Sequence, residues 1–223
     1  MIMEFIKDVS VVIGLWVLFY NLTAWQREHK GKRNIELAED TLALFYEAKE
    51  VIAWMRNPIG FTNETDSIKK EERETEEDFG ARKRASFIFV RYKQNNELFN
   101  KINSLRYRFM AQIGKEKAKP FDDLNKIIKE IVSSARMLAM LWSERHFSTT
   151  EDEEKKRREK IMKHERIIWD TFSDDDPINT KINKLILDIE KICENVIMAK
   201  GTLHGLLNLP VRMFRKLKGV KNE

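Results

Sequence analysis

Four histidines and a single cysteine are the residues of this 223-residue chain best suited to metal binding or nucleophilic catalysis. They are His29, His146, His164, His204 and Cys193. None of the histidines has a glutamate three residues before it, as di-iron bundles require, and none belongs to an H-E-x-x-H zinc motif. One cysteine cannot build a thiolate zinc site. We therefore expect no metal ion and no other cofactor.

Two acidic arrangements have a chemical interpretation and a simpler structural one. Glu144 and His146 would lie together at a helix end and could act in acid–base catalysis, but a solvent-exposed pair without a chemical role is the simpler interpretation. The aspartates at 174–176 converge poorly on a cation from one turn, and no EF-hand spacing follows them. Gly-rich phosphate loops and the G-x-S-x-G elbow are absent. The sequence contains no catalytic motif, so an enzyme with a site built from dispersed residues ranks last.

The chain is organised around an uncharged stretch, Val9 to Trp25, which reads VSVVIGLWVLFYNLTAW. Its seventeen residues would reach about 25 Å as a helix, the short end of what a hydrocarbon core of about 30 Å requires. A buried core helix would carry a polar stripe, which this stretch lacks, and a signal peptide would need a basic start and a small-residue cleavage site. We expect an uncleaved transmembrane helix at 9–25, with these residues in the bilayer: Val11, Ile13, Leu15, Trp16, Leu18, Phe19 and Trp25.

The charges on either side of this stretch predict its orientation. Residues 1–8 carry a net charge of −1, whereas residues 26–34 carry +3. Basic residues stay on the cytoplasmic side, so we expect a single-pass inner-membrane protein with 1–8 outside and the rest in the cytoplasm. The single cysteine fits a reducing compartment. The basic residues expected at the membrane surface are Arg27, Lys30, Lys32 and Arg33.

Composition favours an all-α fold for the remainder. Charged residues make up 35% of the chain, Gly and Pro are few, and no Asn-Gly or Asp-Gly turn joins alternating runs. Such a composition suits helices with solvated faces. We expect a cytoplasmic bundle of about four to five helices over 35–199. Its expected helices are 35–56, 81–113, 121–147, 150–172 and 177–199, and a mobile charged loop covers 61–80.

Two of these helices carry apolar seams of the coiled-coil type. Their apolar residues alternate steps of three and four along about three heptads. Such seams predict packing along another helix, within the chain or between two copies. The seam residues are Leu124, Ile128, Ile131, Leu138 and Trp142 in the first helix and Ile182, Leu185, Ile189, Ile192 and Val196 in the second.

The net charge of +5 lies at the two ends of the chain. The tail 200–223 carries +5, and the body 34–199 carries −2. An amphipathic tail would bind anionic lipid headgroups, and a disordered soluble tail is the alternative. The helix at 81–113 interleaves basic and aromatic residues, which can bind nucleic acid or can simply pair with the acidic loop. The basic residues of the tail that would bind headgroups are Arg212, Arg215, Lys216 and Lys218.

These features favour a membrane-anchored interaction or scaffold protein whose bundle binds a protein partner or a second copy of itself. The alternative is a membrane-tethered nucleic-acid-binding protein that uses residues 81–113 and the basic tail. The sequence does not indicate a biological process.

Overall fold

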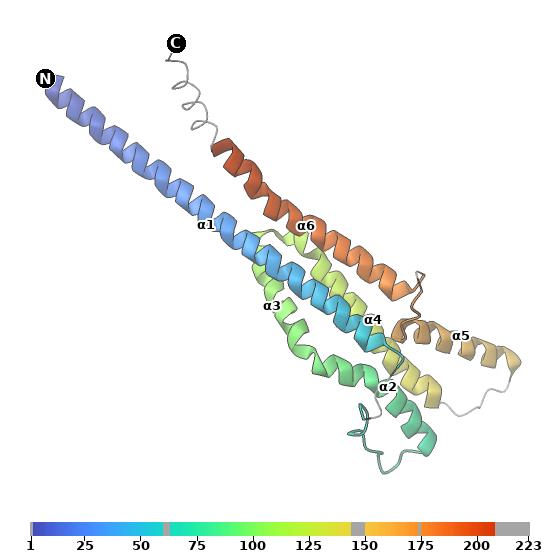
Figure 1. Ribbon diagram of the computed structural model, residues 1–223. Coiled ribbons are helices and arrows are strands. Elements are labelled where there is room, and N and C mark those ends of the chain that lie inside the picture. Colours follow the sequence, from blue (N-terminus) through green and yellow to red (C-terminus); the bar gives the residue numbers. More distant parts are fainter. Residues whose placement is uncertain (1, 60–62, 144–149, 174, 208–223) are drawn as a thin grey trace. The chain divides into compact units, whose positions relative to one another are not determined.

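Within its described residues, the computed structural model contains six α-helices, one short 3₁₀ helix and no β-strand (Figure 1). The described residues are 2–59, 63–143, 150–173 and 175–207, with the side chains of 2–15, 17–19 and 199–207 excepted. The predicted all-α helical bundle is therefore confirmed.

The chain divides into two compact units. The terminal unit comprises Met1–Asp40 and Cys193–Glu223, and the central unit comprises Thr41–Ile192. Two helices, α1 (Ile2–Arg56) and α6 (Pro177–Leu207), contribute residues to both units. The site described below lies wholly in the central unit.

Helix α1 is continuous through the predicted membrane span, the basic segment 26–34 and the first predicted bundle helix. The helix continues through Gly31, because one glycine destabilises a helix by only about 1 kcal/mol. The helix ends at Arg56, because Pro58 disfavours the helical conformation at the residue before it. Three elements that were predicted separately are thus one helix.

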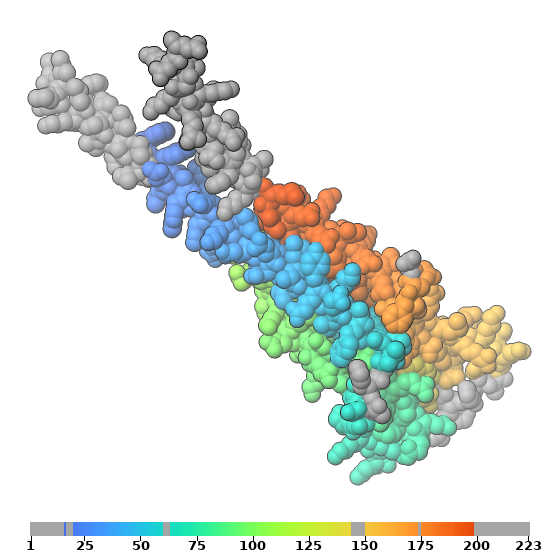
Figure 2. All heavy atoms as spheres, in the orientation of Figure 1, coloured from blue at the N-terminus to red at the C-terminus, as the bar shows by residue number. Residues whose placement is uncertain are grey.

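Over the part of the chain that is described, no helix carries a run long and apolar enough to cross a bilayer. The predicted span at 9–25 therefore stays a prediction. Trp16 and Trp25 are exposed, as are Tyr20 and Leu22, and side chains project from α1 around residues 20–30 in Figure 2. The span residues whose side chains lie outside the described part are Val11, Ile13, Leu15, Leu18 and Phe19.

The central unit is built around α4 (Lys119–Ser143), which packs against α2 (Glu76–Gln94), α3 (Asn96–Gln112) and α5 (Glu151–Ile168). A 3₁₀ helix, Lys115–Ala118, precedes α4. Phe121 lies at the centre of the core, with its ring 5.0 Å from that of Phe45 and 5.1 Å from that of Phe109.

The predicted helix 81–113 is two helices, and its start lies earlier than expected. Helix α2 begins at Glu76 because the Thr75 hydroxyl accepts a hydrogen bond from the Asp78 backbone N–H at 3.1 Å and acidic residues fill the first turn. It ends where the Asn95 side chain donates to the Arg91 carbonyl at 2.9 Å, which competes with helix continuation. Gly114, at a φ of 134°, follows the end of α3.

Caps predicted from local sequence are confirmed at α5 and α6. The Thr150 hydroxyl accepts from the Glu153 N–H at 3.4 Å, and Asp176 Oδ1 accepts from the N–H groups of Ile178 and Asn179, both at 2.9 Å. Helix α5, however, ends at Ile168, before the predicted end at 172.

The seam residues mostly lie inside this chain. In α4 the four aliphatic seam residues are buried and Trp142 is half-buried, so the α4 seam packs against the chain's own helices. In α6 the residues Ile182, Leu185 and Ile189 are buried, whereas Ile192 and Val196 are half-buried.

Candidate functional site

Two arginines of the central unit are completely buried, and the first of them, Arg91, holds the end of α1. Its guanidinium donates to the carbonyls of Trp54 at 3.0 Å, Asn57 at 2.7 Å and Ile59 at 3.1 Å. It also pairs with Glu64 at 3.0 Å. The last carbonyls of a helix lack partners within the helix and form its negative pole. Arg91 therefore satisfies them and fixes the segment around Glu64 against α2.

The second buried arginine, Arg56, does the same for α5. It donates to the Ile167 carbonyl at 2.9 Å and the Trp169 carbonyl at 2.8 Å. It also pairs with Asp176 at 2.8 Å, with both side chains fully buried. Asn179 Oδ1 and the Arg166 carbonyl complete its partners. The end of α1, the end of α5 and the start of α6 therefore meet at one guanidinium.

Asp176 is held ionised by this arrangement. Burial acts to raise the pKa of its carboxyl, but hydrogen bonds from Arg56 and from the backbone N–H groups of Asn179 and Thr171 outweigh burial and lower the pKa to about 2. One carboxylate of the triple aspartate is thus committed to a cap and a buried ion pair. No cluster of three or more His, Cys, Asp or Glu side chains suited to a metal ion occurs in the described chain.

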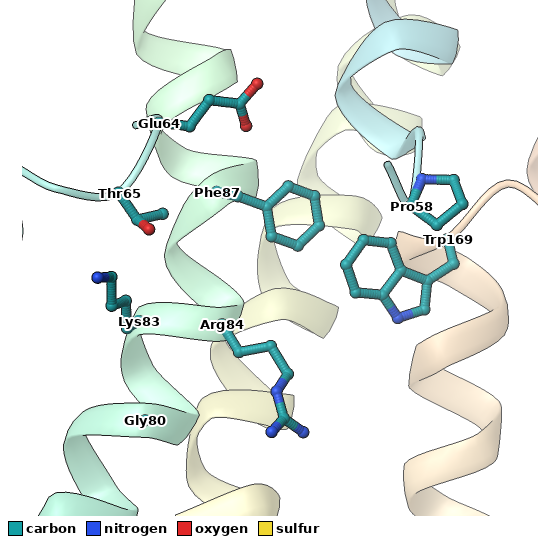
Figure 3. Close-up of a pocket in the computed structure, with 8 residues that line it drawn as sticks. All are labelled: Pro58, Glu64, Thr65, Gly80, Lys83, Arg84, Phe87 and Trp169. Carbon is teal, nitrogen blue, oxygen red and sulfur yellow. The ribbon is translucent and has the colours of Figure 1, made fainter. Parts of the chain in front are cut away.

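A cavity of about 360 Å³ adjoins both arginine networks (Figure 3). One wall consists of Phe87 from α2 and Trp169 from the segment after α5, whose rings stack at 4.5 Å with 4° between their planes. Arg91 lies against the other side of this wall, 4.9 Å from the centre of the Phe87 ring, a cation–π distance. The remaining lining residues are Pro58, Glu64, Thr65, Gly80, Lys83 and Arg84. We call this cavity the α2 pocket.

Two cations from α2 line the pocket beside the aromatic wall. Lys83 has only a long contact, 3.9 Å, with the exposed Asp66, and such surface pairs contribute little. Arg84 forms no ion pair with any described residue, and its guanidinium lies 5.2 Å from the Trp142 ring. The lining carboxylate, Glu64, already binds Arg91. The pocket therefore offers hydrogen-bond donors and an apolar wall, a combination that suits an anionic ligand with an apolar part.

The side of the pocket at Gly80 is open. A Cβ atom built on this residue meets nothing within 4 Å beyond its chain neighbours and the backbone of its own helix. Gly80 lies within helix α2, so a larger side chain there has room without a backbone change.

The residues that sequence alone suggested for chemistry lie elsewhere. His164 is hydrogen-bonded through Nδ1 to Ser134 Oγ at 3.1 Å, but Ser134 is buried and burial lowers the pKa of the histidine. Burial raises the pKa of Cys193 to about 12, so its thiol is unreactive. His29 stacks on Trp25. Glu144, His146, Asp174 and the side chain of His204 lie outside the described residues.

The predicted membrane-surface residues have only a partial description. Lys30, Lys32 and Arg33 are exposed, and Arg27 Nε donates to the Thr23 carbonyl at 3.2 Å. The four basic residues of the tail, Arg212, Arg215, Lys216 and Lys218, lie outside the described part of the chain.

Sequence reasoning missed the α2 pocket and the two buried arginines. It did note that basic residues of 81–113 can pair with the acidic loop, and this pairing occurs. Arg82 binds Glu74 bidentately, which lowers the pKa of that carboxyl to about 2. Arg91 binds Glu64. What the sequence lacked was any signal that Arg91 is buried whereas Arg84, seven residues earlier, is exposed.

The fold and the site thus define an all-α protein with a cationic, aromatic pocket at the end of a helical bundle. No protein-family model matches the chain, and comparisons with curated proteins and with solved structures find no significant match. Its function is therefore inferred from its own residues.

Proposed function

We propose that this protein is a membrane-anchored interaction protein. Residues 9–25 cross the inner membrane, with 1–8 outside, and the central unit binds a protein partner in the cytoplasm. The basic tail 200–223 binds anionic lipid headgroups of the same membrane. No catalytic step forms part of this function.

The main support for the proposed membrane anchor is the exposure of large apolar side chains on an uncharged stretch of α1. Trp16, Tyr20, Leu22 and Trp25 are 69%, 51%, 53% and 62% exposed. Apolar surface in water costs about 25 cal/mol per Å², whereas in lipid it carries no such cost. Trp and Tyr also prefer the headgroup level. This concentration of aromatic residues next to the basic segment 26–34 therefore favours a bilayer around them.

Two polar side chains at this end of the stretch, those of Thr23 and Arg27, bond within the helix, which suits a bilayer. The Thr23 hydroxyl donates to the Tyr20 carbonyl at 2.9 Å. Arg27 reaches back one turn to the Thr23 carbonyl.

Partner binding is assigned to the surface of the central unit because the α4 seam is buried within the chain. With Leu124, Ile128, Ile131 and Leu138 covered, that seam is not offered to a second copy. The α2 pocket, in contrast, carries an apolar wall beside two cations: Lys83 has only a long contact with Asp66, and Arg84 has no ion pair with a described residue.

Nucleic-acid binding through 81–113 ranks second. Two of the basic residues that suggested it, Arg82 and Arg91, each pair closely with a glutamate of the segment 64–74. A surface neutralised in this way releases few counterions from a phosphate backbone.

The anchor is tested by alkaline extraction of membranes that contain the full chain. We expect the wild-type protein in the membrane pellet and the double variant Leu15→Arg/Leu18→Arg in the soluble fraction, because each arginine at a span centre costs about 2.5–3.5 kcal/mol. Leu187→Arg, at an exposed position of α6, is the matched control and should stay in the pellet. A soluble wild-type chain would disprove the anchor. A reporter fused to Glu223 that is active only in the cytosol tests the orientation.

A further inference from the structure

We propose that the α2 pocket binds an acidic segment of a protein partner. One apolar side chain of that segment packs against the Phe87–Trp169 wall, and neighbouring carboxylates bind Lys83 and Arg84. This inference rests on the proposed partner binding by the central unit and is independent of the membrane anchor.

The size of the pocket supports a short segment as the ligand. Ligand pockets commonly measure about 300–1,000 Å³, and this one, at about 360 Å³, is at the small end. It accommodates one large side chain with the adjoining backbone, whereas a dinucleotide cofactor requires more room.

The charges of the lining residues select an anion. Glu64 is committed to Arg91, and Arg84 has no carboxylate partner in the described chain. Arginine next to an aromatic ring binds carboxylates in a planar, bidentate manner. An acidic side chain beside the apolar one therefore meets, in Arg84, a cation without a carboxylate partner among the described residues.

The surroundings favour a peptide over a nucleic acid. The segment 63–78 beside the pocket contains eight acidic residues and three basic ones, and this negative charge repels an extended phosphate backbone. A short acidic segment presents only one or two carboxylates, and these lie at the two cations.

The test uses the full chain in detergent micelles and four capped pentapeptides. The first has a central phenylalanine flanked by glutamates. The others replace the glutamates by glutamines, the phenylalanine by serine, or both. Binding is measured by calorimetry and by the indole N–H resonance of Trp169, which the variant Trp169→Phe identifies. We expect the first peptide to bind and to shift this resonance, and each replacement to weaken binding at least tenfold.

Two variants keep the fold intact and remove the pocket. Lys83→Gln/Arg84→Gln removes the cations and should weaken binding of the first peptide at least tenfold. Gly80→Leu fills open space and replaces a helical glycine by a good helix former, so loss of binding cannot be attributed to unfolding. Lys129→Gln/Lys160→Gln, at exposed positions of α4 and α5, is the charge-matched control and should bind normally.

Three results would overturn the inference. The first is that no peptide binds the wild-type chain. The second is that the first peptide binds the Gly80→Leu chain as well as the wild-type chain. The third is that a single-stranded thymidine decamer binds more strongly than the peptides and that Gly80→Leu abolishes this binding. The first two leave the membrane anchor intact, because alkaline extraction tests the anchor separately.

Discussion

Replacing Arg56 should destabilise the central unit more than any exposed substitution. Removal of one partner from a buried ion pair costs about 3–5 kcal/mol, because the other charge stays buried without compensation. In Arg56→Met the Asp176 carboxylate loses that partner, and the carbonyls of Ile167 and Trp169 lose a hydrogen-bond donor. The total free energy of unfolding of a domain is only about 5–15 kcal/mol, so this loss is a large share.

The partners of Arg56 predict a ranking as well as a magnitude. Asp176→Asn keeps the side-chain oxygen that accepts from Ile178 and Asn179, so we expect a smaller loss, about 1–3 kcal/mol. Arg56→Lys should fall between the two, because an ammonium has three donors and no planar fork.

The assay is urea unfolding of the full chain in micelles, monitored by the circular dichroism signal of its helices. The matched control is Arg158→Met, since Arg158 is exposed on α5 and pairs with Glu154 one turn away; it should cost no more than about 0.5 kcal/mol. Two results would refute the reasoning: a loss below 1 kcal/mol for Arg56→Met, or a larger loss for Asp176→Asn than for Arg56→Met.

Two further predictions follow from the pKa shifts. The pKa of Asp176 is depressed to about 2 in the folded chain, so this carboxylate contributes about 2 kcal/mol of stability that is complete above the ordinary pKa of 3.8 and is lost as the pH falls toward 2. The decrease in unfolding free energy at acid pH should therefore be smaller in Asp176→Asn than in the wild-type chain. An equal pH dependence in both chains would contradict this. Burial raises the pKa of Cys193 to about 12, so iodoacetamide at pH 8 should label the native chain far more slowly than the urea-unfolded chain, and equal labelling rates would contradict the burial.

Much of the fold follows from local sequence. The steps of three and four in α4 and α6 predict which face is buried, because a helix places such residues on one side whatever surrounds it. Pro58 ends α1, and Asp176 with Pro177 begins α6, through bonds made within a few residues. Such features need only the chain's immediate neighbours, so the sequence is sufficient to predict them.

Other helix boundaries depended on side-chain hydrogen bonds that compete with those of the helix backbone, and the apolar pattern does not show such bonds. The interruption between α2 and α3 arises where the Asn95 side chain bonds to a backbone carbonyl, although the apolar periodicity continues on both sides. In α1, Gly31 is the one residue between the predicted span and the first bundle helix that disfavours a helix, and the helix passes through it.

Only the tertiary structure decided the site. The five acceptors of Arg56 lie between 110 and 123 residues further along the chain, so no local pattern distinguishes this arginine from a solvated one. The same holds for Phe87 and Trp169, which form one wall from segments that are distant in sequence. The sequence by itself determined the all-helical fold, the buried faces of α4 and α6, and the caps of α5 and α6, because these depend on neighbours within one or two turns. Which arginines are buried, and which are exposed beside an aromatic pocket, was decided by where three helix ends meet.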